Sequence, residues 1–237
     1  IWGAGIHVIG TAATGNVLQG NKIGTDPTGI FAMPNQGDGV SLNGASGNFV
    51  GGTTAAARNI ISANNGDGVF IGTNLASGAN NNVVEGNYIG VDADGDEALS
   101  NGARGVHLDS NATGNVIGGD SPASRNVISG NGTGVWLNGN GHVVEDNFIG
   151  IDYLGGRAIP NTEVGVRLEG CALCSVQGNV ISGNPVGILL TAGLGVAVAV
   201  QSPEVYSTSA RLLVEGAEIP DSLAASTVQT GAAEQLE

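Results

Sequence analysis

The sequence predicts an all-β fold: a parallel β-helix, or β-solenoid, of about seven coils stiffened by asparagine ladders. Three observations lead to this prediction: 42 glycines and 24 asparagines among 237 residues, a short internal repeat, and asparagines that recur at fixed places in the repeat. Glycine and asparagine are unfavourable in helix interiors and frequent in turns. Many short strands joined by many turns are therefore expected.

Each repeat begins with an alternating apolar segment that follows a glycine. Seven such segments, from GIHV to GILL, start at Gly5, Gly39, Gly68, Gly105, Gly134, Gly165 and Gly187. A second apolar segment follows, as in NVLQG and NVVEG, and a third is seen in RNIIS and RNVIS. Short alternating runs bounded by turn residues predict strands. Three strands and three turns in as few as 22 residues form one coil, and such coils stack about 4.8 Å apart.

Asparagine recurs in three columns when the repeats are aligned. The column before the second strand comprises Asn16, Asn48, Asn82, Asn115, His142 and Cys174. The column that opens the third strand comprises Asn21, Asn59, Asn87, Asn126, Asn147 and Asn179. The column before the next coil comprises Asn35, Asn64, Asn101, Asn131, Asn161 and Asn184. Stacked amides bond to each other and to turn backbone, so these columns predict buried ladders, with His142 as a ladder residue rather than a ligand.

Alternate coils carry an insertion with the pattern D-x-x-G-x-x-A-x-x-N. The three copies span residues 26–35, 92–101 and 152–161. The other coils lengthen a different turn, which is expected to keep neighbouring bulges apart. The first Asp of each insertion is expected to cap its own turn by accepting backbone N–H bonds.

The middle insertion, DADGDEALSN, adds carboxylates that its sister loops lack. Calcium bound by Asp92, Asp94 and Asp96 is therefore the alternative to a purely structural turn. A calcium loop of the helix-loop-helix type needs glycine at its sixth position and a carboxylate at its twelfth. Here the glycine is fourth and the twelfth residue is Ala103, so the structural turn is favoured. The sequence indicates no other cofactor.

Outward positions of the first strand place chemically useful side chains on successive coils. The pairs His107/Asp109, Trp136/Asn138 and Arg167/Glu169 follow one another, and Phe70 precedes them. The simplest interpretation of these side chains is an ordinary solvated sheet face with cross-strand pairs. A glycan-binding strip would use Trp136, Asn138 and Phe70. A catalytic strip would use His107, Asp109, Arg167 and Glu169, with His107 or Asp109 moving a proton and Arg167 binding a carboxylate.

The net charge, the length of the apolar runs and the cysteine content argue against three functional classes: nucleic-acid binding, membrane insertion and zinc binding. The net charge is −14 and Lys22 is the only lysine, so the basic stripe that a nucleic-acid partner requires is missing. No apolar run reaches the roughly 18–20 residues of a membrane helix. Cys171 and Cys174 form one C-x-x-C motif without a second pair, which disfavours zinc and leaves buried thiols or a local disulfide.

The repeats GNYIG-D--G--A--N---GV-L and N-IGG----RNVISGN--GV-L resemble a known family over about residues 1–190. They are similar to the right-handed, single-stranded parallel β-helix repeats of the pectin-lyase-like superfamily, especially the bacterial multi-repeat type of secreted and surface proteins. That superfamily includes lyases, hydrolases, epimerases, phage tailspikes and non-catalytic adhesins, so the resemblance implies a fold more than a function. Its paired-aspartate hydrolase motif and its DPHD epimerase motif do not occur in this sequence.

Taken together, the sequence predicts a repeat domain over residues 1–190 and a non-repeat cap or mobile tail over residues 191–237. The expected function is that of a non-catalytic domain of a secreted or cell-surface bacterial protein, acting as a rigid stalk or as a polysaccharide-contacting surface. Two alternatives stay open. One is a polysaccharide lyase or epimerase that works on the exposed strand face, and the other is a module that associates with itself end to end through an open coil.

Overall fold

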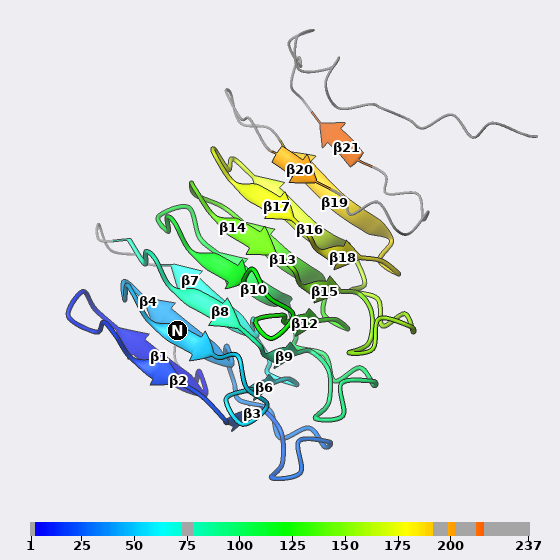
Figure 1. The fold of residues 1–237 in the computed structure, drawn as a ribbon. Helices are drawn as coiled ribbons and strands as arrows, with labels where there is room; N and C mark the ends of the chain where they lie inside the picture. The colour runs from blue at the N-terminus through cyan, green and yellow to red at the C-terminus, as the bar shows by residue number, and fades with distance from the viewer. Residues whose placement is uncertain (1–2, 73–77, 192–198, 202–211, 216–237) are drawn as a thin grey trace, which may run out of the picture.

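The chain folds into a solenoid of short parallel strands, arranged as three sheets (Figure 1). The computed structural model describes residues 3–72, 78–191, 199–201 and 212–215. Within these ranges no helix has the length and apolar character needed to cross a membrane. The prediction of an all-β parallel β-solenoid is confirmed.

Each sheet is built from strands of successive coils. Sheet A has the order β1 (Ile6–Ile9), β4 (Val40–Asn43), β7 (Val69–Gly72), β10 (Arg104–Leu108), β13 (Thr133–Leu137), β16 (Val164–Glu169), β19 (Val186–Thr191) and β21 (Leu212–Glu215). Sheet B has the order β2 (Val17–Leu18), β5 (Phe49–Gly51), β8 (Val83–Glu85), β11 (Val116–Gly118), β14 (Val143–Glu145), β17 (Ser175–Gln177) and β20 (Ala199–Gln201). Sheet C has the order β3 (Lys22–Ile23), β6 (Ile60–Ile61), β9 (Tyr88–Ile89), β12 (Val127–Ile128), β15 (Phe148–Ile149) and β18 (Val180–Ile181).

Six coils contain one strand from each sheet, and β19 opens the next coil. The seven glycine-led segments therefore correspond to six complete coils and the beginning of a seventh. Beyond residue 191, β20 pairs in parallel with β17, and β21 pairs in parallel with β19. Most of the expected cap or tail over residues 191–237 lies outside the described residues.

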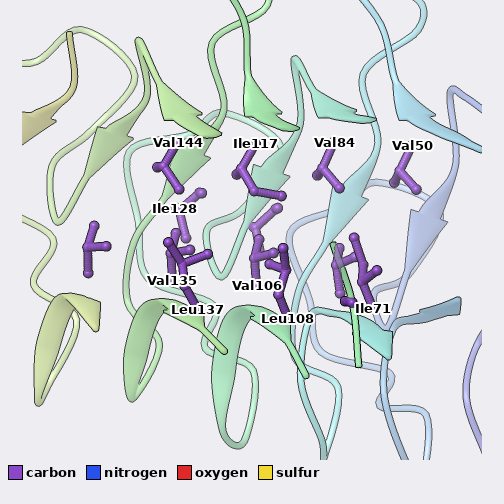
Figure 2. Close-up of a cluster of buried hydrophobic side chains, with 14 of the residues drawn as sticks. Val50, Ile71, Val84, Val106, Leu108, Ile117, Ile128, Val135, Leu137 and Val144 are labelled. Atoms are coloured by element: carbon purple, nitrogen blue, oxygen red, sulfur yellow. The ribbon is translucent and has the colours of Figure 1, made fainter. Parts of the chain in front are cut away.

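The core is a column of branched apolar side chains that point into the solenoid from all three sheets. Figure 2 shows Val106 and Leu108 of β10 facing Ile117 of β11, with Ile128 of β12 nearby. All four side chains have no exposed surface. Burial of each such side chain contributes about 1.5–3 kcal/mol. Because inward residues stack on the same position of the neighbouring coil, the sequence alternation sets the register of every strand pair.

The three predicted asparagine ladders are present, and their members satisfy the turn backbone. Asn87 is typical: its Oδ1 accepts from the backbone N–H of Asn59 at 3.3 Å and from Asn59 Nδ2 at 2.9 Å. Its own Nδ2 donates to the carbonyl of Val50 at 2.9 Å and to Asn126 Oδ1 at 3.1 Å. The same pattern links Asn64 to Asn101 in the ladder before the next coil. The amides therefore supply the turns with buried hydrogen bonds that water cannot provide there.

The first ladder changes character at its far end, where histidine and cysteine replace asparagine. His142 Nδ1 accepts from the backbone N–H of Asn115 at 3.2 Å, and Nε2 lies 2.9 Å from the carbonyl of Asn138, to which it donates. Burial lowers the pKa of His142 below its usual value, so this ladder histidine stays neutral. In the next coil Cys174 is joined to Cys171 by a disulfide, which decides between the two readings of the cysteine pair.

The three insertion loops form a stack of their own beside sheet C. Asp92 Oδ1 accepts the backbone N–H of Gly95 at 2.8 Å, and Asp26 and Asp152 cap their loops in the same way. The capping prediction is confirmed. The three loops belong to alternate coils, and they also bond to each other across the coil between them. Ala93 N–H donates to the carbonyl of Gly29 and Tyr153 N–H donates to the carbonyl of Gly95, both at 3.0 Å.

A second apolar cluster lies between sheet C and these loops. Its members are Ile60, Tyr88, Val91, Val127 and Ile159, with Ala93 and Phe148 packed against them. The loops therefore cover the outer face of sheet C instead of leaving it to solvent. Arginines that precede the second ladder close the cluster, as Arg58 stacks on Tyr88 and Arg125 stacks on Phe148, each at 4.1 Å from the ring centroid.

Candidate functional site

The outer face of sheet A carries a continuous strip of large side chains on four neighbouring strands. Parallel pairing places Phe70 beside His107, His107 beside Trp136, and Trp136 beside Arg167. Two residues further along the chain, Asp109 and Asn138 directly follow β10 and β13, and Glu169 is the last residue of β16. We call these seven residues the sheet A strip. The predicted order of the strip is confirmed, since the register is fixed by the inward valines and leucines.

The rings of the sheet A strip contact one another in a row along the solenoid axis. The centroids of Phe70 and His107 lie 5.3 Å apart in an edge-on arrangement, and those of His107 and Trp136 lie 5.6 Å apart. Such separations are in the range favourable for aromatic pairs. The three rings therefore form a platform that is one residue wide and three strands long.

Two guanidinium groups lie against the ring of Trp136. Arg104 Cζ lies 4.1 Å and Arg167 Cζ lies 4.2 Å from the ring centroid. The two arginines come from β10 and β16, the strands on either side of β13. Arg167 is also paired with Glu169 at 2.9 Å. A sugar ring that stacked on Trp136 would compete with these guanidinium groups for the ring.

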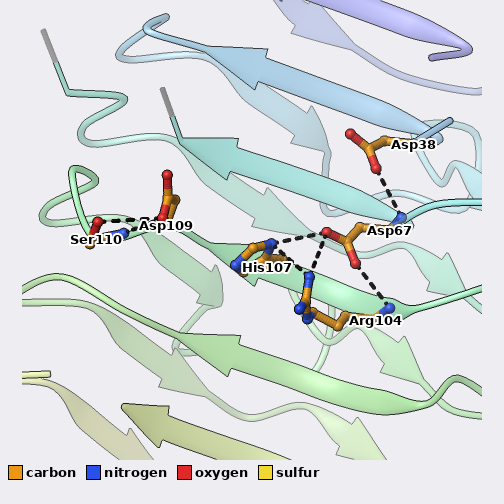
Figure 3. A network of polar contacts seen from close by, with 6 residues as sticks. All are labelled: Asp38, Asp67, Arg104, His107, Asp109 and Ser110. Carbon is orange, nitrogen blue, oxygen red and sulfur yellow. Dashed lines mark hydrogen bonds and ion pairs between the residues drawn. The ribbon is translucent and has the colours of Figure 1, made fainter. Parts of the chain in front are cut away.

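A buried carboxylate, Asp67, organises the edge of the strip (Figure 3). Its Oδ1 accepts the backbone N–H of Arg104 at 3.0 Å. Its Oδ2 lies 2.9 Å from His107 Nδ1 and 3.4 Å from Arg104 Nη1. The Asp67 side chain is only 7% exposed, so this carboxylate is held by its partners rather than by water. Its backbone N–H in turn donates to Asp38 Oδ1 at 2.9 Å.

The environment of Asp38 favours its protonated form. Burial raises the pKa of this carboxyl above its usual value, and although the hydrogen bond from the Asp67 N–H opposes this rise, the charge of Asp67 adds to it. Ionisable residues thus lie at or just before the start of three consecutive strands of sheet A: Asp38 before β4, Asp67 before β7 and Arg104 at the start of β10.

The contacts of His107 restrict the hydrogen bonds that its Nδ1 can make. Arg104 Nη1 lies 3.2 Å from His107 Nδ1, but a guanidinium group can only donate hydrogen bonds. Nδ1 can therefore donate to Asp67 or accept from Arg104, but not both at once. A proton on Nδ1 directed at Asp67 leaves Nε2 of the neutral ring as an acceptor, which is the arrangement of a general base.

The four residues predicted for catalysis do not converge on one point. Asp109 turns toward the following turn, where its Oδ1 accepts the backbone N–H of Ser110 at 2.8 Å. Figure 3 shows Asp109 apart from the network of Asp67 and His107. Arg167 and Glu169 pair with each other on the far side of Trp136. The structure thus brings His107 together with Asp67 and Arg104, which were not among the predicted site residues.

Asp67 and Arg104 escaped prediction because they precede the glycine that opens each repeat. Read as a column, this position holds Asp38, Asp67 and Arg104 on three successive coils, and an acid beside a cation in such a column is a recognisable signal.

Two carboxylates of the middle insertion loop, those of Asp92 and Glu97, make contacts within the protein. Asp92 Oδ1 also accepts from the backbone N–H groups of Asp96 at 3.3 Å and Glu97 at 3.4 Å. Glu97 pairs with Arg157 of the next insertion loop at 2.9 Å. Among the residues that the structure describes, no three His, Cys, Asp or Glu side chains are grouped so as to hold a metal ion. These contacts give Asp92 and Glu97 structural roles in the loop stack.

A comparison with models of known protein families finds no match to this chain, and a comparison with curated protein sequences also finds none.

Proposed function

We propose that this chain is a non-catalytic β-solenoid domain of a secreted or cell-surface bacterial protein, of the pectin-lyase-like type. In this proposal the stacked coils act as a rigid stalk, and the sheet A strip contacts polysaccharide. The observation that carries the proposal is the pairing within the strip. Two arginines lie against Trp136, and Arg167 is neutralised by Glu169, so the strip is a preorganised surface rather than a set of groups directed at one reacting atom.

The charge balance of the strip favours a neutral polysaccharide over a strongly anionic one. Each arginine that flanks Trp136 already has a carboxylate partner, Asp67 for Arg104 and Glu169 for Arg167. The chain as a whole carries a net charge of −14, which repels polyanions over a distance of about a Debye length. Polar rims and aromatic edges that bind sugar hydroxyls and C–H groups do not require a free cation.

A binding panel with matched variants tests this proposal. The full chain is assayed by affinity electrophoresis against neutral and uronate polysaccharides, beside Trp136→Ala and Phe49→Ala. Phe49 is the control because it is an aromatic residue that is 43% exposed on sheet B, away from the strip. We expect retardation by at least one neutral polysaccharide, lost in Trp136→Ala and kept in Phe49→Ala. Equal retardation of the two variants would locate binding elsewhere.

The Asp67–His107 pair favours catalysis as a second candidate. A buried carboxylate that orients an imidazole is a common acid–base arrangement. A lyase or epimerase working at this pair would release unsaturated products or isomerised uronates from a polysaccharide. Activity that is present in the native chain and abolished in both His107→Ala and Asp67→Asn would replace the binding proposal with this one.

End-to-end association is a third candidate, because β1 is an edge strand of sheet A. An unpaired edge is a template for another chain. Light scattering over a dilution series tests it: a mass that falls on dilution supports association, and a constant monomer mass rejects it.

A further inference from the structure

The sequence holds two Asn-x-Ser/Thr triplets, which is the acceptor pattern of N-linked glycosylation. One is Asn111-Ala112-Thr113 and the other is Asn131-Gly132-Thr133. The triplets lie in the same repeat, but the fold gives their asparagines opposite environments.

Asn131 belongs to a buried ladder and has no room for a modification. It has no exposed surface. Its Nδ2 donates to the carbonyls of Ile89 at 3.1 Å and Ser129 at 3.0 Å. An oligosaccharide on this nitrogen would remove these bonds and place a polar group inside the solenoid, so a chain modified there could not close its coils.

Asn111 lies on the surface, in the turn that leads from sheet A to sheet B after β10. Asn111 and Thr113 are both exposed, whereas Ala112 between them is fully buried. An oligosaccharide attached to Asn111 would therefore lie at the solvent-exposed surface and would not have to enter the core.

Hydrogen bonds within the folded turn occupy the recognition elements of the triplet. The Thr113 hydroxyl donates to Asn80 Oδ1 at 2.9 Å, and the Thr113 backbone N–H donates to the same oxygen at 2.9 Å. The Ala112 N–H donates to the carbonyl of Asp109 at 2.8 Å. A transferase must bind the hydroxyl and an extended acceptor segment, so these bonds exclude it from the folded turn. Modification has to take place before this coil closes on the preceding one.

A carboxylate distinguishes the two triplets further. Asp109 stands two positions before Asn111, whereas Ser129 stands two positions before Asn131. Oligosaccharyltransferases that require an acidic residue at this place accept the first triplet and reject the second.

We propose that Asn111 is the acceptor of an N-linked oligosaccharide in this protein and that Asn131 is not. Asn111 Nδ2 attacks the anomeric carbon of a lipid-diphosphate-linked oligosaccharide. The C1–N bond forms, the C1–O bond to the diphosphate breaks, Nδ2 loses one proton, and the lipid diphosphate leaves. The modification rests on the proposed export of the chain, because such donors are used on the far side of a membrane.

Expression of the full chain with an export signal tests the proposal, in a bacterial host that carries an acid-requiring oligosaccharyltransferase and its lipid-linked donor. Intact mass spectrometry is expected to show an increase of one oligosaccharide, and peptide mapping is expected to place it on Asn111. Asn111→Gln, Thr113→Ala and Asp109→Ala are each expected to abolish the mass shift. Circular dichroism confirms that the variants fold, and a known acceptor protein in the same cells confirms that the transferase is active.

Two results would overturn the proposal. One is an unmodified chain in cells where the control acceptor is modified, and the other is an oligosaccharide on Asn131 of the folded protein. A second measurement tests the timing: the purified transferase is expected to modify the urea-unfolded chain and to leave the folded chain unmodified. Neither readout depends on polysaccharide binding, so failure here is distinguishable from failure of the proposed function.

Discussion

Truncation of one ladder asparagine tests whether the amide ladders stabilise the solenoid. In Asn87→Ala, the backbone N–H of Asn59 loses its acceptor, and one Nδ2 hydrogen of Asn59 loses the same oxygen. Both donors are fully buried, and each unsatisfied buried group costs about 1–3 kcal/mol. The expected loss in the free energy of unfolding is therefore about 2–6 kcal/mol, a large part of the stability of an ordinary domain.

The control is the same substitution at the end of the same ladder. Asn21 is only half-buried, and after Asn21→Ala the Asn59 Oδ1 still accepts from the backbone N–H of residue 21 at 2.9 Å. Truncation therefore strands no described donor, and a loss below about 1 kcal/mol is expected. Urea unfolding followed by circular dichroism measures both variants. Equal unfolding midpoints for the two variants would refute the view that buried amide bonds, rather than apolar packing alone, hold the turns.

Three further changes follow from particular contacts. His142 is neutral in the folded protein because burial lowers its pKa from the usual 6.5. Below pH 6.5 the unfolded chain takes up a proton that the folded chain does not, so the free energy of unfolding falls as the pH is lowered. His142→Asn is therefore expected to reduce the change in urea midpoint between about pH 7.5 and about pH 5. Replacing Cys171 and Cys174 together by alanine opens a covalent loop of about four residues, for which loop entropy predicts a loss of roughly 2 kcal/mol, measured as a lower urea midpoint under oxidising conditions. Gly95→Ala is expected to lower the free energy of unfolding by about 2–4 kcal/mol, because φ is +76° and a new Cβ would lie 2.6 Å from the Tyr88 ring. Its control is Gly156→Ala, whose Cβ would meet nothing within 4 Å, and which is expected to match or slightly exceed native stability in thermal melts.

The backbone could be predicted from the repeat, because every coil has the same pattern of apolar strand residues and turn asparagines. Alternating apolar residues fix which face of a strand is buried, and asparagines at equal positions lie next to each other once the coils stack. The ladders, the capping role of Asp92 and the order of Phe70, His107, Trp136 and Arg167 all follow from this translation along one axis.

Contacts that skip a coil or depend on a long side chain were not predictable in the same way. The stacking of insertion loops depends on how far each loop folds back over sheet C, which no single repeat reveals. The positions of Arg104 and Arg167 on Trp136 depend on flexible side chains that have many rotamers. Asp67 was missed because its importance comes from His107 on the next coil, 40 residues away in the sequence.

The insertion-loop stack also changes the range over which the coils influence one another. In a simple solenoid, each repeat interacts with its nearest neighbours only, and unfolding can proceed one coil at a time. Here the bonds from Ala93 to Gly29 and from Tyr153 to Gly95 join every second coil directly. A coil without an insertion therefore lies between two coils that are hydrogen-bonded to each other. Under mechanical load this segment is expected to unfold in units of two coils, which makes the solenoid stiffer and its extension more abrupt than the number of coils alone implies.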